Sequence, residues 1–181
     1  MREVLKIYAI IYHEDDPRKN TALRMIKAGI AVPITRKSRI GKPIILNPFS
    51  EDYLGPWLKE IVFKNGILVV DASWKRLTKN KFKGLRGFHV KLPPLLPGNP
   101  VNYGKTCVLS SIEAVAASLY ILGFRDLFEK LLGLYKWMNT FYDLNKELLE
   151  EYSKARDNWE LVNTVIEYWG LENPCYNVED N

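Results

Sequence analysis

The feature that most constrains the fold is the apolar run Ile67-Leu68-Val69-Val70, which ends at Asp71. Such a run without polar alternation is typical of a strand buried on both faces of a parallel sheet. A short helical segment ending near Gly66 precedes it, and another strand-like segment, Val4–Tyr12, begins the chain. Strands that alternate with helices predict an α/β fold whose parallel sheet has right-handed crossovers and binds ligands beyond its strand carboxyl ends.

The rest of the first half completes this prediction. A helix is expected over residues 19–28, with Gly29 placed to end it. Apolar pieces at 30–34 and 44–46 predict two short strands around a basic loop at 35–39. The proline-rich segment 92–100 is expected to be a shaped loop or a short edge strand, because its four prolines exclude a regular element.

The second half predicts helices. Ser110 and Glu113 form a capping box, apolar residues follow at helical spacing, and Gly123 is placed to end the helix. Further helices are expected at about 125–133, 144–155 and 159–168. We therefore predict a basic α/β domain over residues 1–91 and an all-helical domain over 92–181. A cluster of aromatic residues at 135–142 is interpreted as core.

Charge divides the chain in the same place. The net charge is +5, but residues 1–90 hold 18 Lys and Arg against 8 Asp and Glu, whereas 91–181 hold 8 against 13. Such clustering favours binding of a polyanion, and nucleic acid in particular, over the alternative of a basic face that serves only solubility. Eight cations between Pro17 and Ser50 are the candidate RNA contacts: Arg18, Lys19, Arg24, Lys27, Arg36, Lys37, Arg39 and Lys42.

Composition argues against several other classes. Two cysteines and two histidines are too few and too scattered for a zinc site, so we expect no metal. A Cys107–Cys175 bridge is possible, but two thiols are the expected state in an intracellular protein. The apolar N-terminal run is interrupted by charge and far shorter than the roughly 20 residues that span a bilayer. We expect a cytoplasmic protein that contacts no membrane.

Two polar groups could carry chemistry. Asp71 and Trp74 share one side of a turn, where a carboxylate beside an aromatic wall could accept a proton. The equal alternative is that Asp71 caps the next helix and Trp74 fills core. The loop with His13, Asp15 and Asp16 is more typical of a turn and helix start than of a catalytic site. Charge, periodicity and spacing alone predict a two-part α/β protein that binds nucleic acid, and they indicate no particular reaction.

Longer strings resemble one family, the archaeal and eukaryotic small-subunit ribosomal RNA aminocarboxypropyltransferases. The strings occur in order along nearly the whole chain: residues 13–21 (HEDDPRKNT), 69–74 (VVDASW), 86–89 (RGFH), 92–95 (LPPL), 98–104 (GNPVNYG), 105–117 with its LSSIEA, and 144–149 (LNKELL). The short chain resembles the archaeal form.

The resemblance implies an enzyme that uses S-adenosylmethionine. It would transfer the 3-amino-3-carboxypropyl group to N3 of a hypermodified pseudouridine in small-subunit rRNA and release methylthioadenosine. It also implies a monomer with a SPOUT-like fold and a deep trefoil knot, involved in ribosome biogenesis. Two alternatives remain: a SPOUT-type RNA methyltransferase, and an assembly factor that binds rRNA without chemistry.

The resemblance also implies residue roles. Thr21 and Ser111 would hold the cofactor carboxylate, Val70 its ribose, and the main chain of Leu92 and Cys107 its adenine. Trp74 would pack against the sulfonium methyl group, and Asp71 would lie near the acceptor base as a candidate general base. A helix N-terminus at Ser111 suits an anion, because its free N–H groups point outward.

Overall fold

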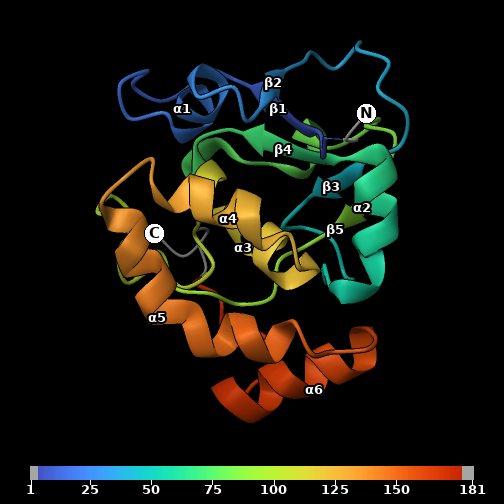
Figure 1. Ribbon diagram of the computed structural model, residues 1–181, viewed down its shortest axis with the longest axis vertical. Coiled ribbons are helices and arrows are strands. Elements are labelled where there is room, and N and C mark those ends of the chain that lie inside the picture. The colour runs from blue at the N-terminus through green and yellow to red at the C-terminus, as the bar shows by residue number, and fades with distance from the viewer. Residues whose placement is uncertain (1–3, 177–181) are drawn as a thin grey trace.

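The computed structural model describes residues 4–176, which form a parallel sheet with helices packed on it (Figure 1). The expected α/β fold with a parallel sheet is confirmed. Five strands lie in the order β2-β1-β4-β3-β5, and every neighbouring pair is parallel. Their bounds are β1 Ile7–Ile11, β2 Val32–Pro33, β3 Ile44–Leu46, β4 Ile67–Asp71 and β5 Phe88–Val90.

Strand β4 is central, as its uninterrupted apolar sequence predicts. It pairs with β1 along its whole length, from Ile7 opposite Ile67 to Ile11 opposite Asp71. The two strands therefore end together, and the chain leaves both of them at the same edge. The backbone N–H of Tyr12 continues the ladder by donating to the Asp71 carbonyl at 2.9 Å.

The two faces of the sheet are covered differently. On one face Ile67 and Val69 join the main hydrophobic core together with residues of the helices. On the other face Leu68 lies in a small cluster whose buried members are Tyr8, Ile10, Ile45, Leu68 and Phe82. This second cluster is completed by residues of the connecting loops, because alternate residues of a strand point to opposite faces.

Six α-helices follow the order of the chain: α1 Thr21–Lys27, α2 Lys59–Asn65, α3 Ser111–Leu122, α4 Arg125–Leu132, α5 Trp137–Tyr152 and α6 Asn158–Trp169. Short 3-10 turns lie at Pro56–Leu58, Trp74–Arg76 and Lys79–Lys81. Helix α3 lies between β4 and the helices α4 and α5, and α5 and α6 form the outer layer at the opposite end from α1 (Figure 1).

Helix α3 begins and ends where local sequence predicts. Ser110 accepts from the backbone of Glu113 and the Glu113 carboxylate accepts from the backbone of Ser110, which makes a complete capping box. Gly123 ends the helix in the left-handed conformation, with φ of 87°. The helix is buried nearly all round, as expected of one with sheet on one side and helices on the other.

Several boundaries differ from the predictions. The helix expected at 144–155 begins at Trp137, and the one expected at 19–28 spans Thr21–Lys27. Strand β5 was not predicted, because its three residues lie in a basic segment and its strand character comes from pairing with β3. Of the aromatic cluster, Phe141 is fully buried, and Tyr135, Trp137 and Tyr142 pack against the same core.

The prediction of two free thiols is wrong. Cys107 and Cys175 form a disulfide across a sequence separation of 68 residues, with their Cα atoms 5.2 Å apart. The backbone N–H of Tyr176 also donates to the Thr106 carbonyl at 2.9 Å. The C-terminal segment is thus attached to the loop before α3, a proximity between distant segments that sequence spacing does not reveal.

Candidate functional site

A buried polar cluster lies at the carboxyl end of β4. The Asp71 carboxylate accepts a hydrogen bond at each oxygen, from Asn20 Nδ2 at 2.6 Å and from Ser111 Oγ at 2.7 Å. Asn20 precedes α1 and Ser111 begins α3, so two helix N-termini meet over the end of this strand. The structure therefore brings together three segments that are 40 and 51 residues apart in sequence.

Asp71 lies in an environment suited to proton transfer. Its side chain is on the helix-covered face of the sheet, and the residue is 9% exposed. Burial raises the pKa of the Asp71 carboxyl above its ordinary value, and the hydrogen bonds from Ser111 and Asn20 oppose part of the rise. Asp15 raises this pKa further and His13 lowers it, so the loop after β1 also acts on the carboxylate.

The two helix N-termini present donors beside this carboxylate. The Thr21 hydroxyl oxygen accepts from the backbone N–H of Ile112 at 3.1 Å, which joins α1 to α3 and leaves the Thr21 hydroxyl hydrogen free to donate. Within residues 4–176, the backbone N–H groups of Thr21 and Ser111 make no protein hydrogen bond. A carboxylate is the kind of group that such donors bind.

Trp74 borders the same region. Its indole Nε1 donates to the Leu109 carbonyl at 2.9 Å, which fixes the ring against the segment that leads into α3. The interpretation of Asp71 as a cap of the following helix is wrong. Only a 3-10 turn follows, its N-cap is Ser73, and the Asp71 carboxylate bonds to other segments.

The remaining predicted cofactor contacts lie on three separate segments of the chain. Val70 packs on the loop-covered face, and Leu92 is half-buried just after the bridge between Tyr53 and Lys91. Cys107 adopts a positive φ of 69°, and its N–H donates to the Leu95 carbonyl at 2.8 Å. The Cys107 carbonyl accepts from the Leu109 N–H at 3.0 Å, so both main-chain groups have a partner and only the carbonyl retains a lone pair.

All eight predicted RNA-binding cations are exposed. Four lie on α1 or just before it, and Arg18 there forms an exposed ion pair with Asp16. The other four lie in the loop between β2 and β3: Arg36, Lys37, Arg39 and Lys42. That loop belongs to the cover of the second sheet face, because Ile34 and Ile40 pack into the small cluster there.

Arg36 differs from its basic neighbours, because its guanidinium already has protein partners. It donates to the main-chain carbonyls of Lys81 and Lys83 and, at 3.2 Å, to the Tyr12 hydroxyl. Lys81 in turn pairs with Glu14 at 2.5 Å and lies over the Tyr12 ring. Arg36 thus joins the two basic loops, whereas Lys37 and Arg39 make no such contact within residues 4–176.

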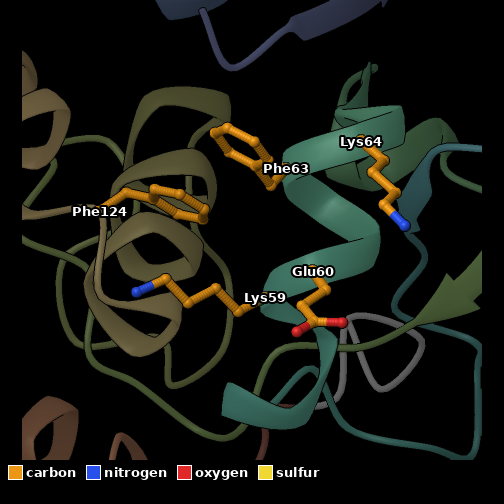
Figure 2. A pocket seen from close by; sticks show the side chains of 5 residues that line it. All are labelled: Lys59, Glu60, Phe63, Lys64 and Phe124. Atoms are coloured by element: carbon orange, nitrogen blue, oxygen red, sulfur yellow. The ribbon is translucent and has the colours of Figure 1, made fainter. Parts of the chain in front are cut away.

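A surface hollow of about 470 Å³ lies elsewhere on the molecule (Figure 2). Phe63 of α2 and Phe124 before α4 face each other across it, with Lys59, Glu60 and Lys64 at its border. Helix α2 leads into the amino end of β4, whereas Asp71 lies at its carboxyl end. The hollow is therefore separate from the polar cluster and contains none of the predicted site residues.

Sequence reasoning assigned no role to Asn20. The residue is 4% exposed and caps α1, since its Oδ1 accepts from the Leu23 N–H at 2.9 Å. A helix-capping preference could have identified that first role, but its bond to Asp71 joins residues 51 positions apart.

Residues 4–176 contain no group of three or more His, Cys, Asp and Glu side chains that could hold a metal ion. None of the helices described there has both the length and the apolar character needed to cross a membrane.

The parallel sheet and the polar groups gathered beyond β1 and β4 place the chain among α/β proteins whose ligands bind at the strand carboxyl edge. A family described as "Ribosome biogenesis protein, C-terminal" matches residues 44–169. The "16S rRNA aminocarboxypropyltransferase" of Sulfurisphaera tokodaii is 46% identical over 165 residues, which are 90% of this chain and 96% of that protein. Its counterpart from Methanothermobacter thermautotrophicus is 39% identical over 166 residues, 89% of this chain and 98% of the other.

A solved structure agrees with these relatives. It is the SAM-dependent rRNA:acp-transferase Tsr3 from Vulcanisaeta distributa, with a TM-score of 0.82 and 37% identity. The match covers 92% of this chain and 89% of that one. The chain belongs to the family of the 16S rRNA aminocarboxypropyltransferases.

Proposed function

We propose that this protein transfers the 3-amino-3-carboxypropyl group of S-adenosylmethionine to N3 of a pseudouridine, or N1-methylpseudouridine, in small-subunit rRNA, with release of methylthioadenosine. The observation that carries the proposal is the 46% identity to a 16S rRNA aminocarboxypropyltransferase over nearly the whole of both chains. The polar cluster around Asp71 supplies the chemistry that the reaction needs at the acceptor base.

The donors beside Asp71 fit the carboxylate of the cofactor. Thr21 offers a backbone N–H and a hydroxyl, and Ser111 offers a backbone N–H at the first turn of the long helix α3. The Ser111 hydroxyl is already bonded to Asp71, so its N–H is the group left for the cofactor. The ribose would meet Val70, and the adenine the main chain at Leu92 and Cys107.

Trp74 would decide which carbon reacts. S-adenosylmethionine supplies three carbon substituents on one positively charged sulfur, and only the one in line with the nucleophile is transferred. The Trp74 ring, fixed by its bond to Leu109, would pack against the sulfonium methyl group and leave the aminocarboxypropyl carbon toward the RNA.

Asp71 would accept the proton from uracil N3. Each carboxylate oxygen accepts one hydrogen bond from the protein and retains a lone pair for the base. Its raised pKa makes it a stronger base than an exposed aspartate, provided that it is ionised at the working pH.

The basic surface would hold the rRNA. The eight predicted cations lie on or just before α1 and in the loop after β2, on the half of the chain with the positive charge.

We also propose a cytoplasmic monomer that acts on the rRNA or the assembling small subunit. The fold would be SPOUT-like with a deep trefoil knot, and the chain would divide near residue 91 into α/β and helical domains. The order of the elements supports the division, because all five strands lie within residues 7–90 and helices α3 to α6 follow them.

The decisive experiment uses rRNA that carries the pseudouridine, or N1-methylpseudouridine, but lacks the aminocarboxypropyl group. It is incubated with the protein and a cofactor labelled in the aminocarboxypropyl group, and the nucleosides are then analysed by mass spectrometry. The proposal expects labelled nucleoside and methylthioadenosine. S-adenosylhomocysteine and methylated RNA would instead indicate a methyltransferase. No product and no calorimetric binding of cofactor would indicate an assembly factor without chemistry.

Trp74→Ala tests the cofactor position separately. We expect weaker binding of S-adenosylmethionine, because the substitution removes the apolar wall beside the methyl group. Unchanged affinity in calorimetry would remove that role from Trp74 while leaving the reaction itself open to the labelling experiment.

A further inference from the structure

We propose that Asn20 is a positioning residue, whose amide fixes the Asp71 carboxylate relative to the helix that carries Thr21. The inference rests on the proposed function, in which Thr21 holds the cofactor and Asp71 meets the base. Asn20 would thereby connect the two halves of the reaction geometry.

The orientation of the Asn20 amide is determined by its surroundings. Its oxygen faces the Leu23 N–H at 2.9 Å, and its nitrogen faces the Asp71 carboxylate at 2.6 Å. A reversed amide would set N–H against N–H and oxygen against carboxylate, so only one orientation satisfies both neighbours. The role in capping α1 therefore forces the amide nitrogen toward Asp71.

Burial makes this contact effective. Asn20 and Asp71 are 4% and 9% exposed, so water competes little for either group. A hydrogen bond to a buried carboxylate stabilises its charged form and restricts its rotation. Ser111 holds the other oxygen, and together the two bonds determine the plane of the carboxylate.

Asn20 also suits this task chemically. An amide neither gains nor loses a proton at ordinary pH, so it cannot compete with Asp71 for the proton of the substrate. The other titratable groups that act on Asp71 are Asp15 and His13, both on the loop after β1. Asp15 and His13 act on the carboxylate through their charge, whereas Asn20 and Ser111 donate hydrogen bonds directly to it.

Two substitutions separate the bond to Asp71 from the helix cap. Asn20→Ser retains a good cap but is too short to reach Asp71, and Asn20→Asp retains the cap while replacing the donor with a second carboxylate. Asn158→Asp is a matched control. It makes the same change of charge on α6, and the Asn158 side-chain oxygen likewise accepts a hydrogen bond from a backbone N–H, that of Tyr53.

The first measurement is the titration of the Asp71 carboxyl carbon by NMR, with the signal assigned from Asp71→Asn. We expect its midpoint to rise by about one pH unit in Asn20→Ser, and by more in Asn20→Asp, where two carboxyls share a proton. Asn158→Asp should leave the midpoint unchanged. A midpoint that stays at the parent value in both Asn20 variants would overturn the proposal.

The second measurement is the pH profile of group transfer to rRNA. In Asn20→Ser we expect kcat near neutral pH to fall about 10-fold, with the acid limb of the profile moved to higher pH and KM for the cofactor little changed. A loss that follows only the folded fraction, or that appears only in KM, would contradict a positioning role.

The two measurements separate failure of this inference from failure of the proposed function. If the parent protein transfers no label but the Asp71 titration moves as expected, the assigned reaction is wrong and the Asn20–Asp71 coupling stands. If the parent transfers label and neither Asn20 variant alters the titration or the pH profile, the reaction stands and the role of Asn20 is wrong.

Discussion

The two faces of the sheet differ in the elements that cover them. One face is covered by helices, and its core extends from Ile7 of β1 to Val165 of α6. The other is covered by loops over a small cluster around Phe82, and the outer side of those loops carries much of the positive charge. Helices provide a rigid cover, whereas loops tolerate the exposed cations that a polyanion requires.

Strand β4 contributes to both faces. Val69 and Asp71 point to the helix-covered face, whereas Leu68 and Val70 belong to the loop-covered face. The carboxylate therefore lies where residues at two helix N-termini hold it, one residue from a position on the loop-covered face. The candidate proton acceptor thus belongs to the helix-covered face. Of the eight cations proposed to bind RNA, four lie in the loop between β2 and β3 on the other face, and four lie on α1 or just before it.

The largest expected effect concerns the cores. We expect Phe141→Ala on the helix-covered side to lower the free energy of unfolding by about 4 kcal/mol, and Phe82→Ala on the other by about 2 kcal/mol, because loops can collapse into the space that is left. Urea unfolding gives both values. Equal losses would mean that the loop cover is as rigid as the helical one.

Asp71→Asn tests whether the carboxylate on the helix-covered face accepts the proton in the reaction. We expect the transfer rate to fall about 100- to 1,000-fold, with affinity for RNA unchanged. Because burial raises the pKa of Asp71, the rate of the parent should increase with pH through a midpoint above the ordinary 3.8, as the carboxylate ionises. A pH profile for Asp71→Asn that retains this limb would assign the proton transfer to another group.

The disulfide tests the attachment of the C-terminal segment. Reduction, or Cys175→Ser, should lower the free energy of unfolding by about 2–4 kcal/mol, since the bridge closes a loop of 68 residues. Thermal unfolding with and without reductant measures the effect. The Cys175→Ser variant serves as the control, because reductant should not change it further.

Local signals in the sequence predicted the elements that local interactions determine. The capping box at Ser110 and the apolar run of β4 were both found, because each is complete within a few neighbouring residues. Strand β5 was missed, since it depends on pairing with β3. The Asn20 bond was not predicted, and the disulfide to Cys175 was named as possible but was not the expected state, because each joins segments more than 50 residues apart.

The candidate site shows the same division. Asp71 was identified because it ends an apolar strand, and Thr21 and Ser111 through the family resemblance. Sequence could not show that Ser111 and Asn20 bond to the same carboxylate, or that Arg36 is engaged by the opposite loop. The first fact depends on which helix ends meet and the second on which loops meet, and the fold alone determines both.

The smallest expected effect concerns the positive charge of the loop-covered face. Arg36 is unsuitable for a test of charge alone, because its replacement by an acidic residue would also remove the hydrogen bond to the Lys81 carbonyl. The test therefore uses Lys37→Glu with Arg39→Glu. We expect RNA affinity to fall about 10-fold at physiological salt, with the salt dependence reduced by about two phosphate contacts. Binding of S-adenosylmethionine should not change.

A matched double reversal on the helical half is the control for that experiment. Lys130 and Lys146 are exposed and, within residues 4–176, form no ion pair, so Lys130→Glu with Lys146→Glu changes the net charge equally. If affinity depended only on net charge, both double variants would weaken RNA binding to the same extent. Weakening confined to Lys37→Glu with Arg39→Glu would instead locate the RNA on the loop-covered face, because only there would a local contact be lost.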